Sequence, residues 1–159
     1  MQISSLLQRL CNADIDFVIV GGYAAVLHGS SMVTRDLDVC MVLSAENVEK
    51  IRDLFRDLHP THRQTPQRLS FLDNPEPGLP MKNLYLQTDL GAIDFLGAIT
   101  GIGSFDDVNQ GAVQVELFGK RLKVIGVQDL IKAKEALGRQ KDLITALELR
   151  AILEKGKCD

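Results

Sequence analysis

Apolar and polar positions along the chain follow two alternating spacings, which predict separate helices and strands. Helical spacing occurs in residues 3–12 and 45–58 and, near the end, in residues 127–137 and 140–155. Short apolar runs typical of strands occur at residues 17–20, 39–42, 84–87, 92–96, 113–117 and 122–125. This order predicts an α/β or α+β fold, in which helices pack on a mixed β-sheet and two helices close the chain.

Residues 60–80 interrupt this alternation. All five prolines of the chain lie in this stretch, around an Asn-Pro-Glu-Pro-Gly sequence. Proline removes a backbone hydrogen-bond donor and breaks helices. We therefore expect a loop or an irregular strand edge here. It could act as a flexible lid that carries Arg63 and Arg68, or simply as a solvated connector.

Composition limits the class of protein. With 159 residues, 45% of them hydrophobic and 25% charged, the chain is long enough for one globular domain, which we assign to residues 1–159. The apolar runs are too short to span a bilayer and no export signal precedes them, so no membrane contact is expected. The net charge of −3 disfavours a protein that coats nucleic acid, although a local basic patch stays open.

The cysteines indicate a reducing compartment. Cys11, Cys40 and Cys158 are odd in number and scattered, and no spacing suggests a zinc site. Cys40 lies within an apolar strand, where a buried free thiol is the usual arrangement. These features predict a cytoplasmic protein, because free thiols persist in the reducing cytosol.

Two carboxylates open the second predicted strand. Asp36 and Asp38 are two residues apart, so on a strand their side chains would share one face, about 7 Å apart. Adjacent acids repel each other unless a cation lies between them, and Mg²⁺ prefers such oxygen ligands. In isolation the Asp-Leu-Asp sequence could also be an ordinary strand start, so its meaning depends on its surroundings.

Residues before and after this pair support a chemical role. Asp94 lies among apolar residues of a later strand, where a charged group needs a partner unless that face of the strand is exposed. Gly21-Gly22 ends the first strand and opens a short helix at residues 23–28. Glycines there allow phosphate oxygens to approach the backbone, although a plain turn could have the same sequence.

In this order, Gly-Gly, a helix, Asp-x-Asp and a later Asp resemble the nucleotidyltransferase superfamily built on the DNA-polymerase-β-like fold. Residues 22–38 and 129–143 are similar to its small stand-alone branch, which includes toxin-like members of type IV toxin–antitoxin and abortive-infection systems. The resemblance covers most of the chain apart from residues 55–82. It implies an enzyme that moves a nucleoside monophosphate from an NTP to an acceptor hydroxyl and releases pyrophosphate.

The resemblance also implies roles for individual residues. Asp36, Asp38 and Asp94 would be catalytic and would bind Mg²⁺ or Mn²⁺. The nucleotide would contact Gly21, Gly22, Thr34, Arg35 and Lys134. Thr34 could instead cap its loop, and Lys134, which falls within an apolar helical stripe, could extend to solvent. Two departures from the family pattern are Gly22, where relatives often have serine, and Met32, where they often have a basic residue.

Three functional hypotheses remain open at this stage. The first is an active metal-dependent enzyme whose acceptor is tRNA or another RNA, a protein or a small molecule. The second is an inactive nucleotidyltransferase-fold module that binds a nucleotide or a protein partner. The third is an incomplete enzyme that needs a partner chain, such as an antitoxin. Metal distinguishes the first two, because an active enzyme should lose Mg²⁺-dependent nucleotide binding when its acids become asparagine.

Overall fold

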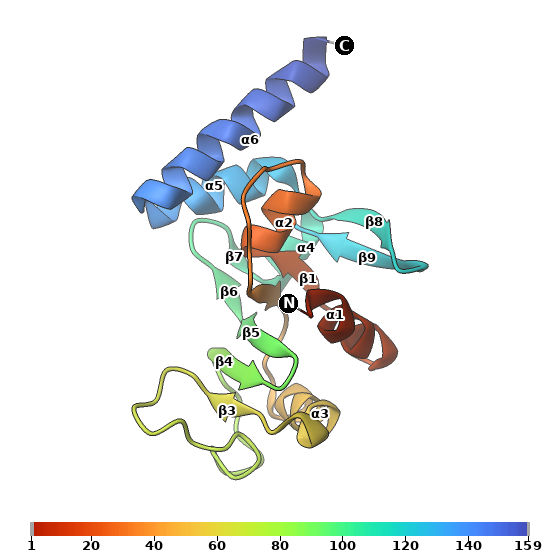
Figure 1. Ribbon diagram of the computed structural model, residues 1–159, viewed down its shortest axis with the longest axis vertical. Coiled ribbons are helices and arrows are strands. Elements are labelled where there is room, and N and C mark those ends of the chain that lie inside the picture. Colours follow the sequence, from red (N-terminus) through yellow and green to blue (C-terminus); the bar gives the residue numbers. More distant parts are fainter. Residues whose placement is uncertain (1, 159) are drawn as a thin grey trace.

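The computed structural model describes residues 2–158, and their side chains as far as Gly156. Within this range the central sheet has seven strands (Figure 1), in the order β3 (Thr61–His62), β4 (Asn83–Thr88), β5 (Gly91–Leu96), β2 (Leu37–Cys40), β1 (Val18–Val20), β9 (Lys120–Val124) and β8 (Val113–Leu117). β2 is parallel to β5, β1 is parallel to β9, and the other neighbours are antiparallel. The sheet is therefore mixed, as the sequence predicted.

Helices pack around this sheet and confirm the predicted fold class. The described helices are α1 (Ile3–Asn12), α2 (Gly21–Leu27), α3 (Ala45–Leu54), α4 (Phe105–Gln110), α5 (Val127–Leu137) and α6 (Gln140–Cys158), with a small sheet of β6 (Ala98–Ile99) and β7 (Gly103–Ser104). α5 packs against α2 and α6, and α6 extends away from the sheet at the top of Figure 1. In the part of the chain described, no helix is long and apolar enough to cross a membrane.

Several elements differ from the sequence prediction, among them β2, α3 and α4. The strand predicted at residues 39–42 begins two residues earlier as β2, which includes Asp38 but not Asp36. The helix predicted at residues 45–58 ends at Leu54, because the backbone leaves the α-helical region at Phe55 (φ −106°, ψ 7°), and a separate 3₁₀ turn follows. α4 was not predicted, because its six residues are too few to show helical periodicity; a capping box starts it.

Arg52 of α3 holds the proline-rich segment in place. Its side chain is only 2% exposed and donates hydrogen bonds to Phe71 O at 2.9 Å and to Pro75 O at 3.1 Å. The guanidinium also lies 4.5 Å from the centre of the Phe71 ring and donates to Glu49 at 2.6 Å. On the other side of the segment, β3 pairs with the edge of β4. The segment is therefore anchored at two places, by Arg52 and by β3.

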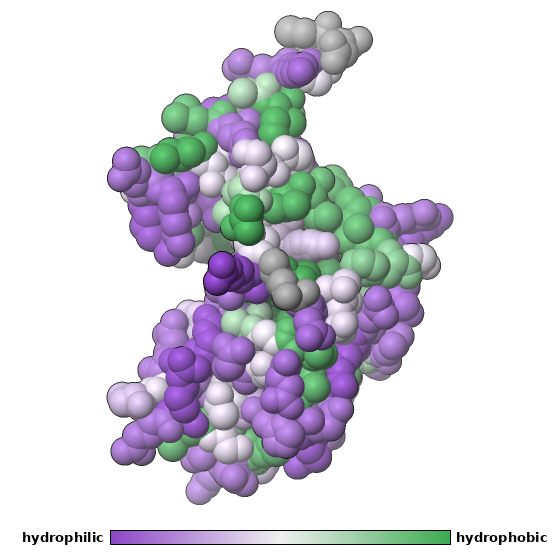
Figure 2. All heavy atoms as spheres, in the orientation of Figure 1, coloured by the Kyte–Doolittle hydropathy of each residue, from purple (hydrophilic) through white to green (hydrophobic). Residues whose placement is uncertain are grey.

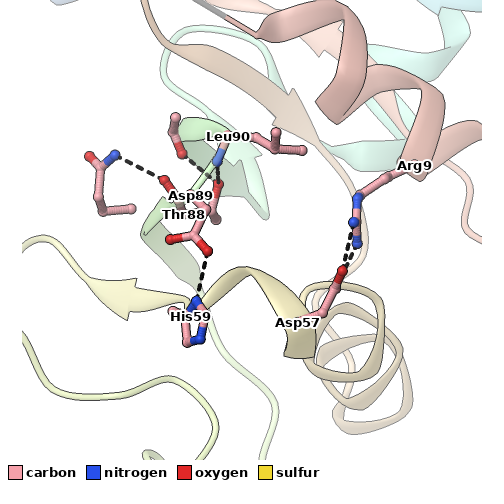
Figure 3. A network of polar contacts seen from close by, with 8 residues as sticks. Arg9, Asp57, His59, Thr88, Asp89 and Leu90 are labelled. Carbon is pink, nitrogen blue, oxygen red and sulfur yellow. Dashed lines mark hydrogen bonds and ion pairs between the residues drawn. The ribbon is translucent and has the colours of Figure 1, made fainter.

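Exposed ion pairs connect the residues just before this segment to their neighbours (Figure 3). Arg9 of α1 donates two hydrogen bonds of 2.8 Å to Asp57, and His59 lies 2.7 Å from the carboxylate of Asp89 in the β4–β5 turn. The hydrogen bond with Asp89 raises the pKa of the His59 imidazole. Exposed pairs contribute little to stability, so the buried contacts of Arg52 dominate the anchoring of the segment.

Replacement of Arg52 should therefore destabilise the protein. We expect Arg52→Met to lower the free energy of unfolding by about 3 kcal/mol, because the carbonyls of Phe71 and Pro75 lose their buried donor. Urea unfolding measures this loss. The matched control is Arg56→Met, which removes an exposed pair with Asp53 and should cost less than about 0.5 kcal/mol. Equal losses in the two variants would contradict the anchoring role.

Candidate active site

Two carboxylates meet where β2 lies beside β5. The parallel register pairs Asp38 with Asp94, and the next strands on either side place Val20 opposite Asp38 and Tyr85 opposite Asp94. Residues paired in this way project from the same face of a sheet, so the two acids lie side by side. Both residues are half-buried. The sheet topology therefore brings together two of the three acids that the sequence selected.

This proximity perturbs the protonation of Asp38. The pKa of Asp38 is raised to about 7, first by burial and then by the charge of Asp94 and a hydrogen bond shared with it. The charge of Asp36 adds a smaller effect of the same sign, and the charge of Lys134 opposes it. Without a bound metal ion, Asp38 therefore retains a proton at pH values where an ordinary aspartate is ionised.

Asp36 lies outside this pair. It precedes β2, and its side chain is exposed. Among residues 2–158, no group of three or more histidine, cysteine or acidic side chains is arranged to hold a metal ion. The Asp38–Asp94 pair nevertheless has the oxygen donors that Mg²⁺ or Mn²⁺ prefers, together with a charge repulsion that such an ion would relieve. The two-carboxylate pair thus fits a divalent cation, whereas the three-carboxylate arrangement is not assembled.

Arg63, from the proline-rich segment, contacts the pair. Its Nη1 donates hydrogen bonds to the carboxylate of Asp94 and, at 3.1 Å, to Leu86 O. The hydrogen bond to Asp94 raises the pKa of the guanidinium; burial opposes this effect, and the charges of Asp36 and Asp38 reinforce it. The sequence suggested Arg63 only as a cation on a possible lid. Its contact was missed because no local pattern connects a loop arginine with a strand thirty residues later.

Gly21 makes room for a side chain of β2, and Gly22 for side chains of the loop that precedes β2. Gly21 has a φ of +67°, and a Cβ atom there would overlap the carboxylate of Asp38. At Gly22 a Cβ atom would lie 3.0 Å from Thr34 Oγ1 and 3.3 Å from Met32 Cε. The two departures from the family pattern are therefore neighbours in space. Met32 and Thr34 fill the volume that a serine side chain at position 22 would need.

The loop between α2 and β2 is fastened to α6. Glu148 accepts hydrogen bonds from Ser30 Oγ at 2.5 Å and Ser31 Oγ at 2.6 Å, and these bonds lower the pKa of its carboxyl. Thr34 Oγ1 donates to Asp36 O at 3.2 Å, a contact that corresponds to the loop-capping alternative for Thr34. Arg35 is exposed on the same loop. The C-terminal helix therefore determines where the loop enters the site.

Lys134 is buried, and the anion that it faces belongs to the chain itself. Its Nζ lies 3.4 Å from one carboxylate oxygen of Asp142, and Arg139 Nε donates to the other at 2.5 Å. Burial acts to raise the pKa of Asp142, but the hydrogen bond from Arg139 and the charge of Lys134 outweigh it and lower the pKa. The sequence did not single out Asp142; the only available signal was the spacing of three residues from Arg139.

A cavity of about 390 Å³ lies against the acid pair. Asp38, Asp94 and Tyr85 line it from the sheet, and Arg139 lines it from the α5–α6 junction. Between them are apolar side chains of Leu96, Ile99, Ala133 and Leu137. Figure 2 shows a hollow at the left edge of the molecule, between the α5–α6 end and the β3–β4 end. A larger cavity, of about 680 Å³, is lined by neither Asp38 nor Asp94, so it is not the candidate active site.

No protein-family model matches this chain, and no curated protein matches it in sequence. Several solved structures match it in fold. A Thermotoga maritima protein assigned as a nucleotidyltransferase has a TM-score of 0.55 at 19% identity, over 98% of this chain and 96% of that chain. The lincosamide antibiotic adenylyltransferase LnuA, bound to lincomycin, has a TM-score of 0.55 at 15% identity, over 94% and 93% of the two chains. ANT(2″)-Ia in complex with adenylyl-2″-tobramycin has a TM-score of 0.52 at 13% identity, over 94% and 97%.

The chain therefore has the fold of the nucleotidyltransferases. Each match extends over nearly the whole of both compared chains, so the C-terminal helices are part of the shared fold. At these low identities the likeness establishes the fold alone. The chemistry depends on the residues of the site.

Asp38→Asn should stabilise the metal-free protein at pH 8. An acid whose pKa rises from 3.8 to about 7 on folding binds a proton more tightly in the folded state, so the free energy of unfolding falls as the pH rises between these values. The asparagine of the Asp38→Asn variant does not ionise, so the variant does not lose this free energy of unfolding as the pH rises. We expect a gain of about 2 kcal/mol at pH 8 in EDTA and almost none at pH 4, measured by urea unfolding.

The control for this prediction is Asp16→Asn, which removes an exposed carboxylate before β1 and should change neither value. A loss of stability at pH 8 in Asp38→Asn would show instead that Asp38 makes a structural hydrogen bond. In that case the repulsion between the two acids would not be the dominant interaction at this site.

Proposed function

We propose that this chain is a metal-dependent nucleotidyltransferase, which moves a nucleoside monophosphate from an NTP to an acceptor hydroxyl. The observation that carries the proposal is the Asp38–Asp94 pair on the wall of a cavity that Arg139 also lines. A nucleotide combines a polyphosphate, which needs cations, with a sugar and base that fit partly apolar walls. The nucleotidyltransferase fold of the chain supports the same reaction.

Asp38 and Asp94 would hold the divalent ion, Mg²⁺ or Mn²⁺. Asp36, whose charge already acts on Asp38, is the candidate for a third ligand. When bound, the ion neutralises charge on the triphosphate and on the oxygens that react. This assignment makes the half-buried acid pair, which is unfavourable by itself, the feature that binds the cation.

Residues around the pair would bind and orient the nucleotide. Lys134 and Arg139 supply positive charge at the α5–α6 side, and Gly21 and Gly22 keep the space next to Asp38 free of side chains. Thr34 and Arg35, on the loop before β2, complete the proposed nucleotide contacts. With both substrates held in line, catalysis would depend mainly on positioning and charge neutralisation.

In the proposed reaction the acceptor oxygen forms a bond to the α-phosphorus. The bond from that phosphorus to the α–β bridging oxygen breaks, and pyrophosphate leaves with the electron pair. The acceptor proton passes to a carboxylate of the Asp38–Asp94 pair, which acts as the general base. The residues need no covalent intermediate for this step, and no nucleophilic cysteine or serine is assigned to it.

A small molecule is the acceptor that the observations favour. LnuA binds lincomycin and ANT(2″)-Ia binds adenylyl-2″-tobramycin, both of them small molecules. The net charge of −3 gives no support to an RNA acceptor. An RNA or protein acceptor, an antitoxin partner and a cytoplasmic location stay predictions from the sequence.

A nucleotide-binding module without turnover is the second candidate. Within the described residues Asp36 stays exposed, and the three acids do not form the single group that a two-metal site requires. Asp94 is also engaged by Arg63. Such a module would bind a nucleotide but would release no pyrophosphate.

Thermal shifts test the site without knowledge of the acceptor. We expect at least one of ATP, GTP, CTP and UTP, with Mg²⁺, to raise the melting temperature by about 5 °C when the nucleotide is saturating. EDTA should remove this shift. Asp38→Asn should also abolish it, because the variant lacks a proposed metal ligand, whereas the exposed Asp16→Asn should retain it.

Pyrophosphate release in the presence of candidate small-molecule acceptors separates the two functions. Release by the wild type, but not by Asp38→Asn, supports the transferase. A nucleotide-induced shift without Mg²⁺ dependence and without pyrophosphate release favours the binding module. If none of the four nucleotides shifts the melting temperature, both candidates are contradicted.

A further inference from the structure

The cation that contacts the acid pair in this structure is an arginine. Arg63 Nη1 donates a hydrogen bond to the carboxylate of Asp94, and the guanidinium is close enough to Asp36 and Asp38 for their charges to act on it. The side chains of Arg63 and Asp94 are 20% and 16% exposed. At this degree of burial an ion pair is less screened by solvent than a surface pair.

Arg63 reaches Asp94 from a fixed position. Its backbone N donates to Tyr85 O at 2.9 Å, which adds residue 63 to the edge of β4, and Tyr85 is the residue opposite Asp94 in the β4–β5 register. Its Nη1 also donates to Leu86 O at 3.1 Å. The guanidinium is therefore attached to the strand beside the acid pair, independently of its bond to Asp94.

Two other cations near the acids, on the α5–α6 side, already have a partner. Lys134 and Arg139 both bind Asp142, which is almost completely buried. Among the described residues, Arg63 makes the ion pair with a member of the Asp38–Asp94 pair. Two half-buried acids that repel each other need positive charge nearby, and Arg63 provides it when no metal ion is bound.

We propose that Arg63 is the cation that neutralises the Asp38–Asp94 pair when no metal ion is bound. A divalent ion gains access to Asp94 by displacing the guanidinium of Arg63. The inference rests on the proposed function in one respect, because it takes the acid pair to be the metal site. It adds a competition within the chain: the same carboxylate is bound either by the guanidinium or by the ion. Arg63 thereby lowers the affinity of the free protein for divalent ions.

This competition has a consequence for the order of binding. The displaced guanidinium keeps its bond to Leu86 O and stays at the edge of the cavity, to which the adjacent Gln64 also contributes. Its freed donors are then available to phosphate oxygens, for which a guanidinium is well suited. A metal–triphosphate complex offers a new partner to both the acids and Arg63, whereas a metal ion alone does not. The ion should therefore enter together with the nucleotide.

The test measures binding of Mn²⁺ alone, from the paramagnetic resonance signal of the free ion. Arg63→Gln should bind Mn²⁺ about tenfold more tightly than the wild type, because the competing charge has been removed. The matched control, Arg68→Gln, removes the same charge from an exposed position of the same segment and should bind Mn²⁺ as the wild type does. Asp94→Asn should weaken the binding of Mn²⁺ both in the wild type and in the Arg63→Gln variant.

Equal or weaker binding by Arg63→Gln overturns the inference, since a residue that merely orients Asp94 would lower the affinity when lost. This result leaves the proposed function intact as long as Mg²⁺–NTP still shifts the melting temperature of the wild type. If Arg63→Gln binds no Mn²⁺ and no nucleotide shifts the wild type, the metal site itself is wrong and the inference fails with it.

A second measurement uses the wild type and does not depend on the folding of a variant. With ¹⁵N-arginine labelling, the Nε resonance of Arg63, assigned by its absence from Arg63→Lys, should shift when Mg²⁺ and a nonhydrolysable NTP analogue are added together. The Arg68 resonance should not move. An Arg63 resonance that stays unchanged at saturating ligand means that the guanidinium is not displaced, and the inference is overturned.

Discussion

The repulsion between Asp38 and Asp94 is the interaction on which the rest of the site depends. The parallel pairing of β2 with β5 forces the two carboxylates together on a half-buried face, where burial and mutual charge keep the pKa of Asp38 near 7. Such a pair is unfavourable unless a cation compensates it. Arg63 does so in the structure by a direct bond, and Lys134 does so at longer range. Two carboxylates whose negative charge needs compensation by cations from other segments are well suited to bind a divalent ion.

The surrounding elements orient the groups that approach this pair. α6 fastens the loop before β2 through Glu148, and the α5–α6 junction holds Lys134 and Arg139 against the buried Asp142. α3 anchors the segment that carries Arg63 through the buried side chain of Arg52. Each of these contacts joins segments far apart in the sequence. The C-terminal helices and the proline-rich segment are thus parts of the site, although neither contains one of the three acids.

Much of the fold could be predicted from local pattern, and the misses have local causes. The central strands and the two final helices were found because their apolar side chains repeat at strand or helix spacing over several turns or pleats. α4 is too short to show such a repeat, and β3 is a two-residue edge strand within a proline-rich stretch. The end of α3 was missed because Phe55 and Leu58 are buried and continue the apolar stripe although the backbone has already left the helix.

For the site, the sequence by itself determined which side chains are chemically unusual: the acids at positions 36, 38 and 94, the paired glycines and a lysine within an apolar stripe. It also indicated the fold, since the order of these residues along the chain resembles the pattern of the nucleotidyltransferase superfamily. Only the tertiary structure decided how they are partnered. It pairs Asp38 with Asp94, leaves Asp36 exposed, directs Lys134 to Asp142 and brings Arg63 to Asp94. Spacing along the chain predicts which face of a strand or helix a residue occupies. Electrostatic interaction depends instead on the distance between charges in space, which is set by strand register and by how the connecting segments pack.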